Sequence, residues 1–142
     1  MPVITDLIRT EADGSISFGN YELKAKTKKS DFEFEGDLYK IKTFDELTRL
    51  EKNELFLYES EPGTAVTHMK ETAEGMSFTA WGPEDAQITI QCEPETDYDI
   101  LIDGEIRDVQ KSNLGGKLSF SVKLGDGSAK VQVLKHEAGQ QP

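Results

Sequence analysis

The sequence contains few of the residues that enzymes use for nucleophilic catalysis or metal binding. Among 142 residues it has one cysteine, Cys92, and two histidines, His68 and His136. A single thiol cannot form an internal disulfide, and a transition-metal site usually needs at least three converging donors. Cys92 also ends the apolar side of an alternating segment, which predicts a buried, inert thiol rather than a partner for His68. We therefore expect no metal and no cofactor.

Motifs that bind phosphate or activate a serine are also missing. The glycine-rich segments precede predicted strands instead of helices, and no Gly-x-Ser-x-Gly sequence occurs. The three arginines, Arg9, Arg49 and Arg107, are far apart in the sequence, which is a weak signal for a carboxylate-binding site. The chain is therefore predicted not to be an enzyme, with no catalytic residue assigned.

Acidic residues outnumber basic ones by 27 to 16, which gives a formal charge of −11. The one basic cluster, at residues 24–29, is flanked by acids, so nucleic acid and anionic membranes are not expected as partners. No apolar run approaches the ~20 residues of a membrane span, and the N-terminus does not resemble a signal peptide. A cytoplasmic location is expected by default, and export outside the general secretory route would leave no mark.

Carboxylates are densest between residues 93 and 108. Alternation spreads them along a predicted strand and its turn, whereas a calcium site gathers 6–8 oxygens on a tight loop. A solvated strand face is therefore expected. The residues concerned are Glu93, Glu95, Asp97, Asp99, Asp103, Glu105 and Asp108.

Period-two alternation of polar and apolar residues, broken by turn residues, predicts an all-β protein. Pro62-Gly63 is the best candidate boundary between two small β units. Residues 1–62 are predicted to form a meander or small sandwich, residues 63–137 an immunoglobulin-like antiparallel sandwich, and residues 138–142 a flexible tail. Strands in the second part are expected at 64–70, 75–81, 86–92, 97–102, 117–124 and 129–135.

Residues 43–52 allow two interpretations. Thr43 and Glu46 have the spacing of a helix capping box, which favours a short helix. Asn53 tolerates the positive φ of a hairpin turn, and this favours strands on either side of it. We expect one helical turn at most, followed by a hairpin.

Aromatic side chains could stack on sugars, and three of them are candidates for ligand binding: Trp81, Tyr58 and Tyr98. Trp81 ends its predicted strand before Gly82-Pro83, at the rim of a loop. Packing inside the protein explains the same residue without a ligand.

The whole chain resembles a family of short proteins from anaerobic gut Firmicutes that are often catalogued as endosialidases. The stretches that carry this resemblance are residues 17–21 (SFGNY), 32–40 (FEFEGDLYK), 58–64 (YESEPGT) and 113–118 (NLGGKL). Sialidase-type enzymes are much larger folds with Asp-box turns, whereas Asp13 and Gly14 are adjacent here and depart from that box. Residues 98–122 also resemble the accessory sandwiches of glycoside-processing enzymes, which implies support or binding instead of cleavage.

These observations favour a non-catalytic binding or self-assembly module that acts through surface contacts. The expected partner is another protein or a second copy, because open strand edges allow association by strand addition. Two alternatives are a carbohydrate-binding accessory module and, less favoured, a minimal sialidase-type glycosidase that uses two acids from residues 93–108.

Overall fold

The protein is all-β, as the alternation predicts. A computed structural model describes residues 3–125 and 127–136, and within them it contains strands but no helix. None of these residues therefore belongs to a helix that could cross a membrane. The predicted tail, residues 138–142, lies outside the described part. The strands are β1 (Ile8–Thr10), β2 (Ile16–Phe18), β3 (Thr27–Phe34), β4 (Asp37–Phe44), β5 (Leu47–Lys52), β6 (Leu55–Glu61), β7 (Ala65–Thr72), β8 (Gly75–Gly82), β9 (Ala86–Gln91), β10 (Asp97–Ile102), β11 (Glu105–Lys111), β12 (Lys117–Val122) and β13 (Gly127–Lys135).

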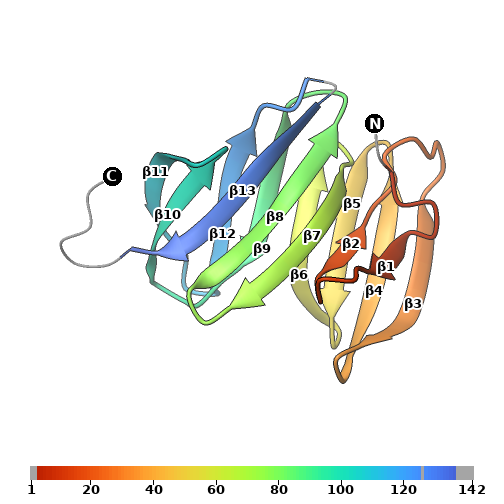
Figure 1. The fold of residues 1–142 in the computed structure, drawn as a ribbon, viewed down its shortest axis with the longest axis horizontal. Coiled ribbons are helices and arrows are strands. Elements are labelled where there is room, and N and C mark those ends of the chain that lie inside the picture. The colour runs from red at the N-terminus through yellow and green to blue at the C-terminus, as the bar shows by residue number, and fades with distance from the viewer. Residues whose placement is uncertain (1–2, 126, 137–142) are drawn as a thin grey trace.

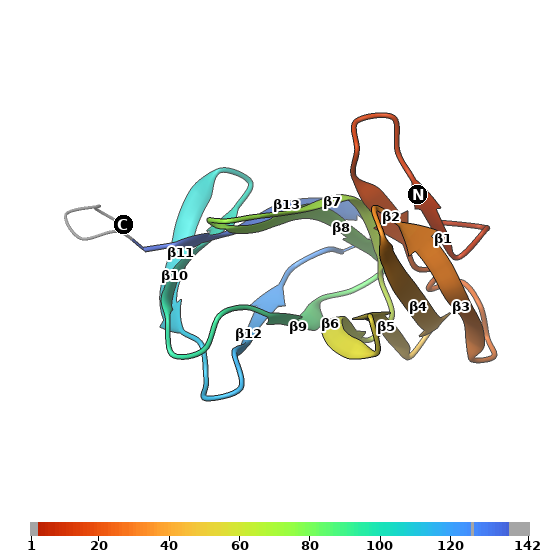
Figure 2. The same ribbon diagram turned by 90° about the horizontal axis from the view of Figure 1, so that it is seen from below.

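Two antiparallel sheets face each other as a sandwich (Figures 1 and 2). The seven-stranded sheet has the order β1-β2-β7-β8-β13-β10-β11, and the six-stranded sheet has the order β12-β9-β6-β5-β4-β3. Figure 2 shows β10 and β11 curving toward β12 at one end of the molecule. The two sheets therefore end in neighbouring strands, β11 and β12, at this end.

A single hydrophobic core fills the space between the sheets. The alternation also predicts which residues face inward, because residues two apart on a strand share one face, and burial confirms this prediction for β8, β9, β10, β12 and β13. Met76, Phe78 and Ala80 of β8 are at most 4% exposed, and Cys92 and Ile102 are the only predicted members that are partly exposed. The other confirmed members are Ile88, Ile90, Tyr98, Ile100, Leu118, Phe120, Val122, Leu124, Val131 and Val133.

Strands from residues 1–62 and from residues 63–137 occur in both sheets. The chain crosses from the six-stranded to the seven-stranded sheet between β6 and β7, where Pro62 and Gly63 lie. The predicted boundary is thus a crossing point between sheets. The immunoglobulin-like connectivity predicted for residues 63–137 is not confirmed, because their strands pair with β2 and β6 of the preceding residues.

Residues 43–52 form strands and a turn, with no helical turn. β4 and β5 are paired from Phe44↔Leu47 onward, and the Thr43 side chain accepts a hydrogen bond from Asn20 N–H at 2.9 Å instead of capping a helix. The expected hairpin after Lys52 is confirmed, since Asn53 and Glu54 have φ values of 52° and 67° between β5 and β6. Strand β11 was not predicted.

Buried hydroxyl groups fix the crossing between β6 and β7. Thr48 Oγ1 donates to Thr64 O at 2.8 Å and accepts from Thr64 N–H at 3.0 Å. Because the single Thr48 proton is used on Thr64 O, Thr43 must donate in the 2.8 Å bond between the Thr43 and Thr48 hydroxyls. The Thr64 hydroxyl lies 2.8 Å from those of both Tyr58 and Ser60. This network ties the crossing to β4, β5 and β6.

Candidate functional site

Two of the three predicted sugar-binding residues lie in the core. Tyr58 is 0% and Tyr98 2% exposed. Tyr58 packs edge-on against Phe18 and Phe78, with ring centroids 5.2 and 5.6 Å away, and burial raises its pKa to about 12. A ring with no exposed face cannot stack on a sugar, so Tyr58 and Tyr98 are structural residues here. This corrects the prediction that Tyr58 and Tyr98 bind a ligand at the surface.

Trp81 is half-buried on β8 and is apart from the two tyrosines. Its indole N–H donates to Thr67 Oγ1 at 3.0 Å on the neighbouring strand β7. The Tyr98 hydroxyl accepts from Glu93 N–H at 3.0 Å, in the loop before β10. The structure therefore does not bring the three aromatic residues together on one surface.

His68 lies in an irregular part of β7 and contacts residues that the sequence did not suggest. Its Nδ1 is 3.2 Å from Asp13 Oδ2 and 3.3 Å from Ser15 Oγ. In a catalytic Ser-His-Asp triad the serine bonds to the ring nitrogen that takes its proton, and the aspartate bonds to the opposite nitrogen and orients the ring. Here both meet the same nitrogen, and Ser15 is fully buried. This cluster does not have the geometry of a nucleophile with its base.

The Asp13 carboxylate gives the fold a specific acid sensitivity. Hydrogen bonds from the Ser15 side chain, then from the Ser15 backbone and His68, lower its pKa from 3.8 to about 2. A lowered pKa in the folded state stabilises the fold above pH 3.8, and this contribution is lost as the pH falls toward 2. Denaturant midpoints measured from pH 4 to pH 2 should fall less steeply for Asp13→Asn than for the wild type. Equal slopes would contradict the assignment.

The remaining candidates are the Cys92 thiol and the carboxylates of residues 93–108, and they are dispersed or already hydrogen-bonded. Burial raises the pKa of the Cys92 thiol to about 11, which disfavours the reactive thiolate. The buried Asp99 is 2.6 Å from His136 Nδ1, and Asp103 accepts from Lys130 N–H at 2.9 Å. In residues 3–125 and 127–136, no group of three or more His, Cys, Asp and Glu side chains could hold a metal ion.

The three arginines do not converge, since each lies on a different strand and pairs with a nearby glutamate. Arg9 on β1 lies 3.1 Å from Glu11, and Arg107 on β11 lies 3.4 Å from Glu105. Arg49 on β5 contacts Glu51 and Glu59, each at 3.3 Å. The three arginines therefore do not form a cluster that could bind a substrate carboxylate.

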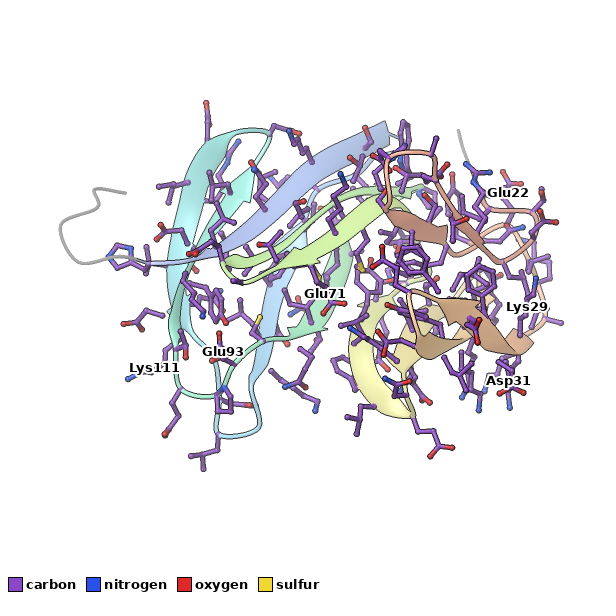
Figure 3. All side chains as sticks on the ribbon, turned by 60° about the horizontal axis from the view of Figure 1, so that its bottom comes forward. Glu22, Lys29, Asp31, Glu71, Glu93 and Lys111 are labelled. Carbon is purple, nitrogen blue, oxygen red and sulfur yellow. The ribbon has the colours of Figure 1, made fainter. Side chains whose placement is uncertain are left out.

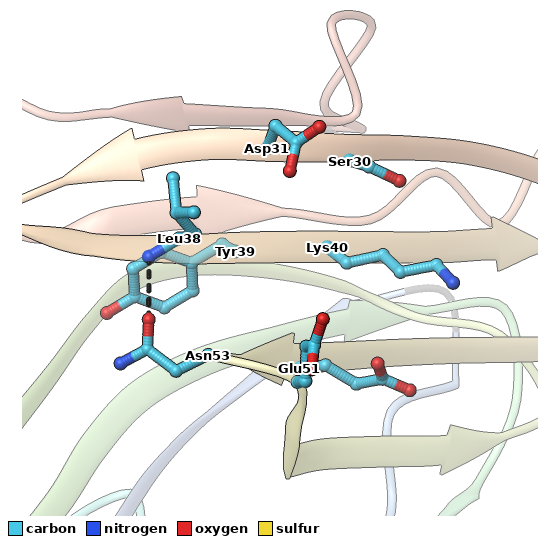
Figure 4. Close-up of a pocket in the computed structure, with 8 residues that line it drawn as sticks. Ser30, Asp31, Leu38, Tyr39, Lys40, Glu51 and Asn53 are labelled. Atoms are coloured by element: carbon cyan, nitrogen blue, oxygen red, sulfur yellow. Dashed lines mark hydrogen bonds between the residues drawn. The ribbon is translucent and has the colours of Figure 1, made fainter.

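A surface hollow of about 770 Å³ lies over β3, β4 and β5 (Figure 4). Polar and charged side chains line most of it, and a hydrogen bond of 3.0 Å from Leu38 N–H to Asn53 Oδ1 crosses one end. Asp31, Lys40 and Glu51 place opposite charges around its rim. It lacks the apolar lining typical of a small-molecule pocket.

A smaller groove of about 450 Å³ separates the sheet edges β11 and β12. Ile100 and Ile102 of β10 line it from one sheet, and Phe120 and Val122 of β12 line it from the other. Arg107, Asp108 and Lys123 surround this apolar floor. The groove is thus an opening of the core between two terminal strands.

The free edge of β12 presents unpaired backbone groups beside this groove. Cys92 N–H donates a hydrogen bond to Gly116 O, so these two residues form a hydrogen-bonded pair next to the β9–β12 ladder. Such pairs occur at every second residue of an antiparallel ladder, and therefore Leu118 and Phe120 bond to β9. Ser119 and Ser121 therefore point their N–H and C=O groups away from β9. No described residue pairs with them, whereas the Lys117 backbone bonds to Asn113.

Comparisons of the chain with protein-family models, with curated proteins and with solved structures found no match. The groove and the free edge of β12 are accordingly the candidate site on structural grounds alone.

Proposed function

We propose that this protein is a non-catalytic module that associates with itself through the free edge of β12. The supporting observation is the pair of outward-facing peptide groups at Ser119 and Ser121, next to an apolar groove where the core opens. An added strand would satisfy these peptide groups and cover the groove, which is how strand addition stabilises complexes.

A two-fold arrangement fits the register of this edge. If two β12 strands pair antiparallel about Ser119, the Ser119 residues exchange both backbone hydrogen bonds. Ser121 then lies opposite Lys117, whose backbone exchanges its bonds to Asn113 for bonds to Ser121. The inward-facing Leu118 and Phe120 then meet their counterparts and extend the core. No like charges lie directly opposite within the paired strands.

The scarcity of carboxylates in and around β12 also favours association of a second copy at this edge. Residues 109–125 contain no aspartate or glutamate, the longest such run in a chain of net charge −11. Two acidic copies repel each other least where carboxylates are absent. Because the remaining repulsion is long-range, added salt should strengthen the association.

Sedimentation velocity over a range of protein concentrations tests this proposal. The wild type should move from its monomer mass of 15.8 kDa toward twice that mass as concentration and salt rise. Ser119→Pro removes the outward N–H without removing a bond to β9, so it should remain monomeric. Ser119→Ala keeps the N–H and should associate like the wild type. A wild type that stays monomeric at every concentration would refute the proposal.

A further inference from the structure

The outer face of the six-stranded sheet carries a row of cations that the sequence does not reveal. Register places Lys28 directly opposite Lys42, and Lys42 directly opposite Arg49, across β3, β4 and β5. Residues opposite one another in an antiparallel sheet share a face, so the three side chains lie side by side. Lys40 precedes Lys42 by two residues on the same face, and Lys26 places its ammonium group 5.8 Å from the Phe44 ring on that face.

Four of these five cations have no carboxylate partner among the described residues. Arg49 pairs with Glu51 and Glu59, but no described carboxylate forms an ion pair with Lys26, Lys28, Lys40 or Lys42. Nearby lysines such as Lys52 do have such partners, in Asp37 and Glu71. Two glutamates share this face, Glu51 opposite Lys40 and Glu59 opposite Arg49, and both form their ion pairs with Arg49, so five cations face two carboxylates.

Repulsion among these cations destabilises the fold locally. Like charges directly opposite on adjacent strands destabilise a sheet. The pKa of Lys42 is lowered by burial and by Lys28, Lys26, Lys40 and Arg49 together, which places all five within electrostatic reach. Figure 3 shows Lys29 and Asp31 on the β3 edge, at the opposite end of the molecule from Glu93 and Lys111. The β3 end of the row therefore lies far from these residues, whereas its Arg49 end approaches Lys117 of β12 through the Phe56 ring.

We propose that the cationic face formed by Lys26, Lys28, Lys40, Lys42 and Arg49 binds an acidic segment of another protein. Carboxylates of that segment form ion pairs with the four lysines, which have none among the described residues. Phe44 lies below Lys26, and Phe56 lies 5.5 Å from Arg49 and 4.8 Å from Lys117, so aromatic rings alternate with the cations. These rings contact the methylene groups of glutamate side chains and apolar residues between them.

The overall charge selects a peptide over a nucleic acid. Nucleic acids carry one charge per phosphate along their whole length and are bound through many clustered cations. Five cations occupy only part of one sheet, and the rest of a molecule with net charge −11 would repel a longer polyanion. A short acidic peptide segment places its charges within the cationic face alone.

Fluorescence anisotropy with a labelled oligoglutamate peptide tests the proposal, at protein concentrations where the chain is monomeric. The wild type should bind at low salt and weaken as salt is added, opposite to the salt effect expected for self-association through β12. The double variant Lys40→Glu/Lys42→Glu should bind about tenfold more weakly. The control Lys111→Glu/Lys130→Glu changes the net charge equally at exposed positions elsewhere and should bind nearly as well as the wild type.

The same variants separate a binding role from a structural one. Lys42→Glu places a carboxylate opposite both Lys28 and Arg49, whereas Lys40→Glu places one opposite Glu51. The two effects oppose each other, so the Lys40/Lys42 double variant should melt close to the wild-type temperature. Loss of binding with retained stability supports the proposal. Equal loss of binding in both double variants, tighter binding of a labelled oligodeoxythymidine than of the peptide, or no binding by the wild type at low salt would each overturn it.

Discussion

Gly19→Ala should destabilise the protein by about 3–5 kcal/mol, because it combines backbone strain with a steric clash. Gly19 has a φ of 98°, in the region that residues with a Cβ avoid. An added Cβ would press on the carbonyl oxygen of Thr64 and lie 3.3 Å from Thr48 Cγ2. Thr64 lies in the buried crossing between β6 and β7 and is hydrogen-bonded to Thr48 of β5, so neither neighbour can move without breaking these bonds.

Gly14→Ala is the matched control for this prediction. Gly14 has a similar φ of 83°, but an added Cβ would meet nothing within 4 Å. This variant should lose only the strain energy, about 1–2 kcal/mol. Urea denaturation of the two variants measures the difference. Equal losses would show that Thr64 is not packed tightly against Gly19.

Thr48→Val should reduce the free energy of unfolding by about 2–4 kcal/mol although it conserves shape. The substitution leaves the buried N–H and C=O of Thr64 and the hydroxyl of Thr43 without their partner. A buried polar group that loses its partner costs far more than the hydrogen bond contributes on balance.

Thr89→Val serves as the control for Thr48→Val. The Thr89 hydroxyl bonds to Ser119 Oγ at 2.7 Å on the exposed face of the same sheet, where water replaces the lost partner. Its loss should stay within about 0.5 kcal/mol. A Thr48→Val variant as stable as Thr89→Val would mean that the hydroxyl network does not hold the crossing.

Alternation in the sequence was sufficient to predict most of the strands but not how they are arranged. Met76, Phe78 and Ala80 could be assigned to the core because the period of two places them on one face. Pairing between distant strands leaves no comparable local pattern, and so the sharing of both sheets by the two halves was not foreseen. Strand β11 was missed because Arg107 and Asp108 are consecutive polar residues at a register shift, where the alternation is interrupted.

The candidate sites could not be predicted from the sequence for the same reason, because they depend on which strands pair. Lys28 and Lys42 are 14 positions apart in sequence, and only register makes them direct neighbours. Tyr58 and Tyr98 were candidates for ligand binding because composition does not distinguish a tyrosine that is hydrogen-bonded in the core from one on a rim. Ser119 and Ser121 showed the expected alternation, but the position of β12 at the end of a sheet follows only from the topology.

Amide hydrogen exchange at Ser119 and Ser121, measured at low and at high protein concentration, tests self-association at this edge most directly. At low concentration both amides should exchange rapidly while those of Leu118 and Phe120, bonded to β9, stay protected. At high concentration Ser119 and Ser121 should become protected as well. If they exchange rapidly at every concentration while Leu118 and Phe120 remain protected, β12 does not pair with a second copy.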